Sequence, residues 1–274
     1  MPWDMNGIVD SHDILMLVLD TLRYDVAERE HHAGRTPNFA ALLPLGWEER
    51  HTPGSFTYAA HQAFFAGFLP TPVDPHADPT RLFAAKFAGS ETTGGRTKTF
   101  ETDNWVTGLA EEGYHTICIG GVGFFNQQTA VSRVLPGLFH EAHWSVEMGV
   151  THRHSAELQF EKASERLRSL PPEQKCLLFI NVSALHQPNY FYCRDTGPDD
   201  LESHAAALRY VDSQLPRLTE ALLLRKRPVF CLILSDHGTA YGEEGWTGHR
   251  LAHPSVWTVP YGETVLTPEQ EVKA

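Results

Sequence analysis

The sequence has few cysteines, no long apolar segment and no leader-like start. None of its four cysteines, Cys118, Cys176, Cys193 and Cys231, forms a CxxC pair, and three lie in or beside apolar runs. This favours buried thiols in a reducing compartment over a disulfide framework. No apolar run is long enough to cross a membrane, and the first residues lack the basic and apolar stretches of a signal peptide. We therefore predict a cytoplasmic protein.

Positive charge is also scarce. The 274 residues include 22 Lys and Arg against 34 Asp and Glu, which gives a formal net charge of −12. This balance argues against binding to nucleic acid or to anionic membranes, so we expect neither as a partner. A small anionic substrate is still compatible, because a bound metal ion can dominate a local field. The length fits one large domain, predicted to span residues 1–274.

Apolar runs alternate with amphipathic segments along the whole chain. Strands are expected at residues 13–20, 114–120, 175–182, 229–234 and 256–259, and helices at 38–43, 58–66, 105–112, 155–170 and 201–224. This alternation is typical of an α/β protein with a mostly parallel central sheet and helices on both faces. Ligands of such sheets bind beyond the carboxyl ends of the strands, and Asp20, His186 and Asp236 each follow a predicted strand.

The most informative segment begins at Ser235. Asp236 and His237 directly follow the apolar run 228–234, and four glycines then let the chain bring His249 back toward them. A carboxylate and an imidazole at a rigid strand end are typical ligands of a divalent cation. The alternative is an ordinary polar turn, because Asp and Gly are common turn residues.

Three further residues each allow two interpretations. A carboxylate that ends a buried strand is costly unless paired or bound to metal, but Asp20 also suits an N-cap or an ion pair with Arg23. Thr57 begins a predicted helix, where its hydroxyl is a cap or, beside a metal, a nucleophile; Ser55 competes for either role. A lone histidine such as His186 is more often a hydrogen-bonded loop residue than a ligand.

A series of short motifs runs in order from about residue 13 to residue 266. They are the strand that ends at Asp20, Thr36-Pro37-Asn38, the helix from Thr57 to Ala66-Gly67, Gly113-Tyr114-His115-Thr116, His186 with Pro188, Tyr210-Val211-Asp212, Ser235-Asp236-His237-Gly238, Gly248-His249 and Val259-Pro260. In this order they resemble the alkaline phosphatase and sulfatase superfamily of metallohydrolases. The resemblance is strongest to short sulfatase-like hydrolases, and it implies an alkaline phosphatase-like three-layer sandwich.

Two departures from the sulfatase pattern shape the expected chemistry. Sulfatases have a Cys or Ser that is oxidised to formylglycine, followed by a proline and an arginine; this chain has Thr57, Ala59 and His61 at those positions. Threonine cannot form formylglycine and is instead the nucleophile of the phosphodiesterase and phosphoethanolamine transferase branches. Asp20 is followed by Thr21 where sulfatases usually have a second aspartate, which again resembles the phosphate branches.

The resemblance implies a metal centre of one or two ions. The first cation would be bound by Asp20, Thr57, Asp236 and His237. The histidines His186 and His249 would hold a second cation, or would bind the substrate's oxygens and protonate the leaving group. His61 would make the anion contact that an arginine or lysine makes elsewhere in the family. Oxygen and imidazole ligands suit Zn, Mn or Fe.

The sequence thus predicts an enzyme, a metal-dependent hydrolase or transferase of phosphate, phosphonate or sulfate esters. Its substrate would be a small anionic ester, attacked by a metal-activated Thr57. Two alternatives stay open: a non-catalytic relative that binds metal or a partner, and a phosphomutase. Specificity is expected to come from loops over the site, at residues 88–102 and 189–200.

Overall fold

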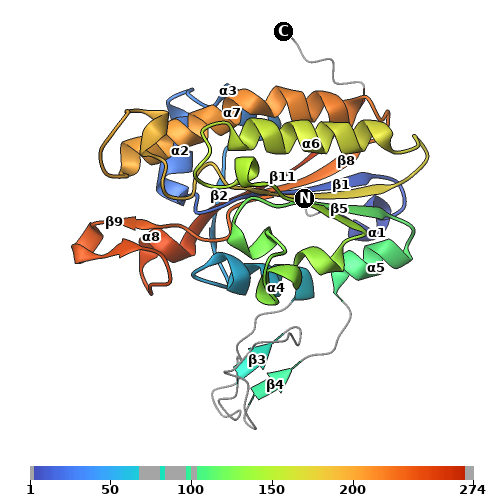
Figure 1. Ribbon diagram of the computed structural model, residues 1–274. Coiled ribbons are helices and arrows are strands. Elements are labelled where there is room, and N and C mark those ends of the chain that lie inside the picture. Colours follow the sequence, from blue (N-terminus) through green and yellow to red (C-terminus); the bar gives the residue numbers. More distant parts are fainter. Residues whose placement is uncertain (1–2, 68–80, 84–96, 100–103, 269–274) are drawn as a thin grey trace.

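A seven-stranded sheet with helices on both faces organises the computed structural model, which describes residues 3–67, 81–83, 97–99 and 104–268 (Figure 1). The strand order is β2-β11-β8-β1-β7-β5-β6. Their bounds are β1 Asp13–Leu19, β2 Glu48–His51, β5 His115–Ile119, β6 Glu141–His143, β7 Cys176–Val182, β8 Val229–Leu234 and β11 Thr258–Leu266. The strands from β8 to β6 are parallel, and β11 runs antiparallel to both of its neighbours. The predicted α/β fold is therefore confirmed.

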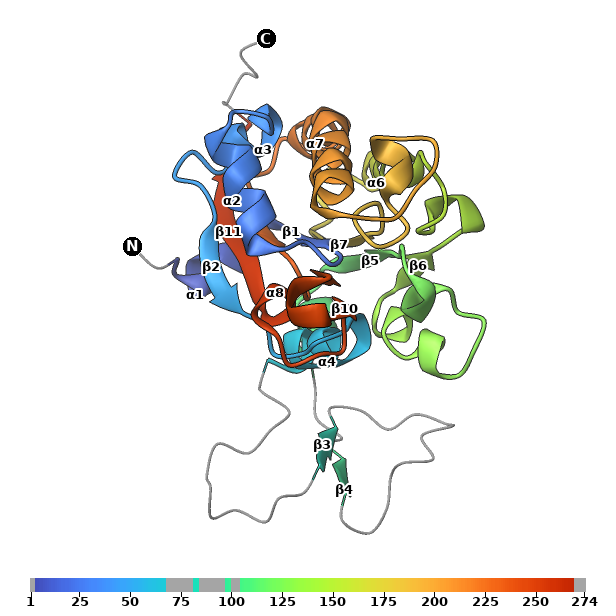
Figure 2. The ribbon, with the colours of Figure 1, turned by 90° about the vertical axis from the view of Figure 1, so that its left-hand side faces the viewer.

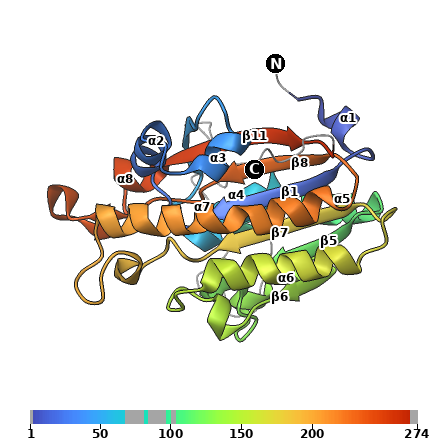
Figure 3. The same ribbon diagram turned by 90° about the horizontal axis from the view of Figure 1, so that it is seen from above.

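Two hydrophobic clusters cover the two faces of the sheet, because side chains alternate along each strand. In β1, Leu15, Leu17 and Leu19 belong to one cluster, and Ile14, Met16 and Val18 belong to the other. The first cluster packs against α2 (Tyr24–His32), α3 (Pro37–Leu42), α6 (Ser155–Ser169) and α7 (Leu201–Leu223). The second packs against α4 (Thr57–Ala66) and α5 (Trp105–Glu111). In Figure 3, α6 and α7 lie side by side over the sheet.

Two predictions about the strands are corrected by the structure. Residues 256–259 were expected to form a strand, but Pro254–Trp257 is the short helix α8 and β11 begins only at Thr258. Proline stands at the start of α8, and the ring of His253 accepts the backbone N–H of Ser255, which caps that helix. The edge strand β2 was not predicted, because its four residues are all exposed and none is apolar.

A hairpin, β9 (Ala240–Tyr241) and β10 (Thr247–Gly248), follows the end of β8. Figure 2 shows β10 and α8 in front of the sheet, at the end where β1 and β8 finish. Gly238 lies so close to α8 that a Cβ there would be 2.1 Å from the Ser255 carbonyl oxygen. The left-handed Gly248 (φ 80°) then turns the chain before His249.

The remaining elements are short. They are α1 Met5–Ile8, β3 Arg81–Phe83, β4 Thr97–Thr99, and the 3-10 helices Gly123–Phe125, Val131–Arg133, Pro136–Leu138, Val146–Met148, Tyr190–Tyr192 and Glu243–Gly245. Of the loop expected at residues 88–102, only Thr97–Thr99 is among the described residues, and it forms a strand. The loop expected at 189–200 contains the helical turn Tyr190–Tyr192.

Candidate metal centre

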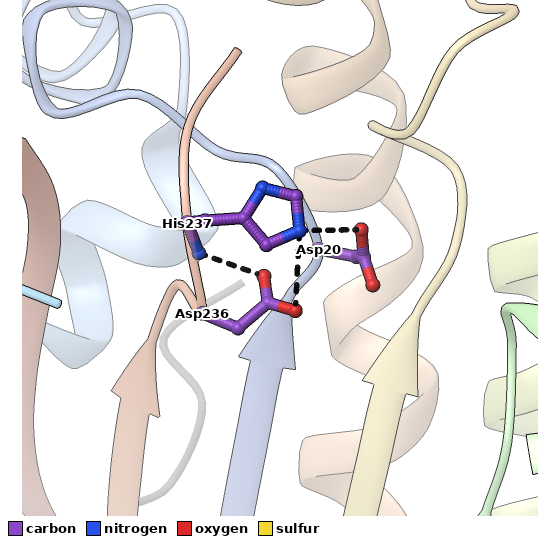
Figure 4. A group of neighbouring side chains, drawn as sticks. All are labelled: Asp20, Asp236 and His237. Atoms are coloured by element: carbon purple, nitrogen blue, oxygen red, sulfur yellow. Dashed lines mark hydrogen bonds and ion pairs between the residues drawn. The ribbon is translucent and has the colours of Figure 1, made fainter. Parts of the chain in front are cut away.

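Asp20 and Asp236 lie side by side because the parallel strands β1 and β8 end at the same level. Val18 is paired with Leu234, so the residues two positions further on meet at one edge of the sheet (Figure 4). One ligand atom each from Asp20, Asp236 and His237 lies within 4.8 Å of the others, and all three residues are fully buried. In the described part of the chain, this is the one group of three or more such ligands.

The hydrogen bonds of the centre leave its inward-facing atoms free. Asp236 Oδ1 accepts the backbone N–H groups of Thr21 (3.2 Å) and His237 (3.0 Å), and Asp20 Oδ2 accepts the amide N–H of Asn181 at 2.9 Å. The other oxygens, Asp20 Oδ1 and Asp236 Oδ2, are buried without a hydrogen-bond partner. Buried orphan carboxylate oxygens are rare, and a bound cation would satisfy both.

His237 presents an unprotonated nitrogen to the same space. Its Nδ1 lies 2.9 Å from the carbonyl oxygen of Gly238, so we assign the ring proton to Nδ1. Its Nε2 lies 3.9 Å from Asp20 Oδ1 and 3.7 Å from Asp236 Oδ2, too far for a good hydrogen bond to either. Fixing one ring nitrogen on a backbone carbonyl is how proteins orient a histidine ligand. The three side chains therefore fit a divalent cation.

The electrostatics of the centre also require positive charge. Burial and the neighbouring Asp236 raise the pKa of Asp20, and burial raises the pKa of Asp236. Burial lowers the pKa of His237, so the imidazole does not supply the missing charge. Two buried carboxylates without a cation are costly, because a low-dielectric environment disfavours the charged form.

Thr57 completes the centre from the helix side. It is the first residue of α4 and 3% exposed, and its Oγ1 lies 3.3 Å from Asp20 Oδ2 and 3.4 Å from His237 Nε2. The cap position belongs to Phe56, and no side chain caps the helix, so the hydroxyl faces the carboxylates. Ser55 contributes a backbone carbonyl, which accepts the N–H of Arg250.

Arg23 does not form the alternative ion pair with Asp20. Its guanidinium pairs with Asp25 and Glu243 instead.

His186 and His249 extend the centre away from the carboxylates. The ring centroid of His249 lies 4.6 Å from that of His237 and 5.5 Å from that of His186. The hairpin therefore returns His249 to the centre, as the glycine spacing predicted. Burial, with the charges of its two histidine neighbours, lowers the pKa of His249 to about 3. Val182, four residues before His186, is a core residue and offers no ligand atom.

His61 lies below the centre and not in an open anion site. It is fully buried, its Nδ1–H donates to the Thr57 carbonyl oxygen at 2.7 Å, and burial lowers its pKa to about 3. Four phenylalanine rings lie 5.4 to 5.8 Å from its centroid, from Phe64, Phe65, Phe125 and Phe179. This position does not suit the predicted anion contact, because the ring is neutral and enclosed by phenylalanine side chains, although its Nδ1 lies 3.7 Å from Asp236 Oδ2. The ring instead supports the first turn of α4.

Sequence reasoning assigned no role to Asn181 or Thr21. Asn181 is an amide within the buried strand β7, and that isolated polar residue in an apolar run was a usable signal for a partner of Asp20. Thr21 adopts a left-handed backbone (φ 65°), which is unusual for a β-branched residue and turns its N–H toward Asp236. No sequence signal distinguished that conformation.

Comparisons with known proteins agree with this fold. The profile of the sulfatase family matches residues 12–261, while a comparison with curated proteins finds no match. One similar solved structure is the C-terminal periplasmic domain of phosphoethanolamine transferase EptC from Campylobacter jejuni, with a TM-score of 0.59 and 14% identity over 93% of this chain and 80% of that chain. The corresponding domain of EptC from Escherichia coli, solved in complex with Zn, gives a TM-score of 0.60 and 14% identity over 94% and 73%.

A third similar structure is longer. The integral membrane protein lipooligosaccharide phosphoethanolamine transferase A from Neisseria meningitidis gives a TM-score of 0.63 and 14% identity over 94% of this chain. This chain spans only 48% of that protein. At these identities the likeness establishes a shared fold.

Two expectations about location are corrected. The prediction of a cytoplasmic protein is contradicted by the similar structures from Campylobacter jejuni and Escherichia coli, which are periplasmic domains. That prediction relied in part on unpaired thiols, but Cys118, Cys176 and Cys231 are buried, and burial makes a thiol inert in either kind of compartment. The expectation of no membrane partner is not supported either, since the Neisseria meningitidis relative is an integral membrane protein.

In the described part of this chain, no helix combines the length and apolarity needed to cross a bilayer. The family match covers nearly the whole sequence and includes every residue of the metal centre. The chain therefore belongs to the sulfatase family and has the alkaline phosphatase-like fold.

Proposed function

We propose that the chain is a metal-dependent enzyme that cleaves or transfers a phosphorus ester through Thr57. The observation that supports this most is the position of the Thr57 hydroxyl, 3.3 Å from Asp20 Oδ2 and 3.4 Å from His237 Nε2. Beside it lie two carboxylate oxygens that have no hydrogen-bond partner. A threonine hydroxyl is a weak nucleophile unless its surroundings lower its pKa, and this centre is built to do so.

One divalent cation would be held by Asp20, Asp236, His237 and the Thr57 oxygen. When bound, such an ion would lower the pKa of the hydroxyl and offset the negative charge of the substrate. Zn, Mn and Fe all suit these oxygen and nitrogen ligands. The zinc complex of the similar Escherichia coli structure makes zinc the first ion to test.

Each side chain of the centre has a separate role in the proposed reaction. Thr57 Oγ1 attacks phosphorus, the bond from phosphorus to the leaving oxygen breaks, and a phosphothreonine forms. The hydroxyl already donates a hydrogen bond to Asp20 Oδ2, which gives its proton an acceptor. The low pKa of His249 keeps it neutral, so it binds a substrate oxygen as a hydrogen-bond donor. We assign to His186 the orientation of a water molecule that protonates the leaving oxygen: its Nδ1–H is held by the Gln187 carbonyl at 2.6 Å, which leaves Nε2 as the acceptor for that water.

Water or a second alcohol then releases the phosphoryl group from Thr57. The names of the similar transferases favour transfer to an acceptor molecule over hydrolysis. Phosphorus is favoured over sulfur because a threonine at position 57 cannot form the formylglycine of sulfatases.

The proposal is tested with purified protein loaded with Zn, Mn or Fe. Turnover of aryl phosphate monoesters, diesters and sulfates is measured, with metal content determined in the same samples. Thr57→Ala should lose turnover by about 1,000-fold or more, while Thr57→Ser should retain part of it. Asp236→Ala should lose the metal. Full turnover in Thr57→Ala, or full metal in Asp236→Ala, would contradict the proposal.

A stoichiometric ion with no turnover on the whole panel would favour the non-catalytic alternative. A phosphothreonine at position 57, detected by mass spectrometry after rapid quenching, would separate covalent catalysis from direct attack by water. Its return to the same substrate molecule would identify a mutase.

A further inference from the structure

The centre lacks the cationic side chain that sulfatases place after the nucleophile. His61 stands at that position, but it is fully buried and enclosed by four phenylalanine rings, so it offers no exposed cation to a substrate. Arg23, close to Asp20 in sequence, is already held by Asp25 and Glu243. A substrate anion therefore needs a cationic partner from another element.

Arg250 is held beside the first turn of α4. Its backbone N–H donates to the carbonyl oxygen of Ser55 at 2.8 Å, and its guanidinium carbon lies 5.0 Å from the centre of the Phe56 ring. Both contacts are to the residues that directly precede Thr57 in the chain. A cation stacked on an aromatic ring keeps its N–H groups available at the ring edge for an anion.

The charge of Arg250 lies beside the centre and is not neutralised there. Arg250 directly follows His249, whose ring centroid lies 4.6 Å from that of His237. Arg250 is exposed and, among the residues that the structure describes, no carboxylate lies within 4.0 Å of its guanidinium nitrogens. Arg23 differs from Arg250 in this respect, because its charge is neutralised by two carboxylates, those of Asp25 and Glu243.

We propose that Arg250 binds the substrate's anionic oxygens in place of the missing family arginine, and that the site takes a phosphorus ester with a single negative charge. This inference rests on the proposed function. Asp20 and Asp236 together balance one divalent cation, so Arg250 adds one net positive charge. That charge matches a phosphodiester or a phosphonate monoester.

A phosphate monoester would bring a second negative charge into this largely buried centre. Its stabilisation would need another cation, but no second group of three ligands exists in the described part of the chain. An excess charge is costly where water is excluded. The site therefore discriminates against dianionic esters.

The first test compares turnover of two esters with the same leaving group at pH 8. Wild-type protein should have a higher kcat/KM for an aryl methyl phosphate diester than for the aryl phosphate monoester. Arg250→Ala should lower the diester value by about 10- to 100-fold, the range for a lost charged hydrogen bond, and Arg250→Lys should recover part of it. Metal content should be the same in all proteins.

The matched control is Arg50→Ala, which should leave turnover unchanged. Arg50 also stacks on an aromatic ring, at 5.2 Å from the centre of Tyr261, but it lies on the edge strand β2 and pairs with Glu48.

The second test measures binding and does not depend on turnover. Calorimetry is carried out on zinc-loaded wild-type and Arg250→Ala protein with diphenylphosphinate, a stable monoanion, and with phenylphosphonate, a dianion at pH 8. The wild-type protein should bind the phosphinate more tightly, and Arg250→Ala should weaken that binding about 10- to 100-fold.

The outcomes separate this inference from the proposed function. Loss of phosphinate binding in Arg250→Ala, in a protein that turns over no ester, would support the role of Arg250 and overturn the reaction. Equal binding and equal turnover in wild type and Arg250→Ala would overturn the role of Arg250. A wild-type preference for the monoester and the phosphonate, or no binding of either probe, would overturn the charge assignment.

Discussion

Replacing Asp236 by asparagine should stabilise the metal-free protein while abolishing its response to metal. Without a cation, two buried carboxylates face each other, and asparagine removes one of the two charges. The amide oxygen of asparagine can keep the N–H bonds from Thr21 and His237 that Asp236 Oδ1 now accepts. Its NH₂ group would point at His237 Nε2, which lies 3.7 Å from Asp236 Oδ2. The substitution therefore fits the site without leaving a new unpaired group.

The size of the effect follows from the pKa of Asp236. Burial raises it from 3.8 to about 7. A raised folded-state pKa means that the stabilisation is fully present below the unfolded value and is lost as pH rises through the folded value. A shift of about three pKa units corresponds to roughly 4 kcal/mol, so at pH 8 the asparagine variant should be more stable by on the order of 2 to 4 kcal/mol. For a chain of this length that is roughly 5 to 10 °C in Tm.

Thermal unfolding in the presence of a chelator, at pH 5 and at pH 8, measures this directly. The Tm advantage of Asp236→Asn over wild type should be small at pH 5 and largest at pH 8. Zinc should then raise the Tm of wild type at pH 8 but not that of the variant. A metal-free variant less stable than wild type at pH 8 would refute the reasoning, because it would show that the two carboxylates do not repel each other.

Asp13→Asn is the matched control at the other end of β1. Asp13 is also a buried carboxylate, but it pairs with Arg225 at 2.7 Å and accepts the backbone N–H of Cys176 at 2.9 Å. Breaking a buried ion pair is destabilising by about 3 to 5 kcal/mol, so this variant should lower the Tm at both pH values. Opposite signs for two buried aspartates on neighbouring strands would show that the effect comes from the metal centre.

Three further predictions test the surroundings of the centre. Asn181→Leu removes the amide that donates to Asp20 at 2.9 Å and should weaken zinc binding about 10- to 100-fold in a competition titration with a chromophoric chelator; unchanged affinity would contradict it. Gly238→Ala places a Cβ 2.1 Å from the Ser255 carbonyl oxygen and should lower the free energy of unfolding, measured with urea, by about 2 kcal/mol or more. An unchanged free energy of unfolding would show that α8 moves away at no cost. Tyr241→Phe removes a hydroxyl that a buried asparagine and a buried histidine share, and should destabilise by about 1 to 2 kcal/mol in the same assay; an unchanged midpoint would show that the hydroxyl is dispensable.

The sheet and the ends of its strands could be predicted from the sequence for a simple physical reason. The strands β1, β7 and β8 are buried on both faces and therefore appear as continuous apolar runs, and Asp20 and Asp236 interrupt that pattern at its end. The edge strand β2 carries no such signal, because all of its residues are polar and exposed. It forms because β11 offers it an unpaired edge, which is a property of the folded sheet.

Two features of the site could not be predicted from the sequence: how deeply a side chain is buried, and where a loop places its residues. Spacing placed His61 one helical turn from Thr57, and the structure keeps them together, but spacing does not show that four phenylalanine rings enclose the imidazole. Arg250 follows His249 in a loop, and its place beside Phe56 depends on a backbone hydrogen bond between segments nearly 200 residues apart. Contacts of this kind leave no local periodicity.

The central claim is that one cation is shared by Thr57 and the three side chains at the ends of β1 and β8. Anomalous diffraction from crystals of the zinc-loaded protein tests it most directly. We expect one ion, with Asp20, Asp236, His237 and the Thr57 oxygen each at about 2.0 to 2.2 Å. An ion held only by His186 and His249, or a centre in which the Thr57 hydroxyl is turned away from the metal, would contradict the claim.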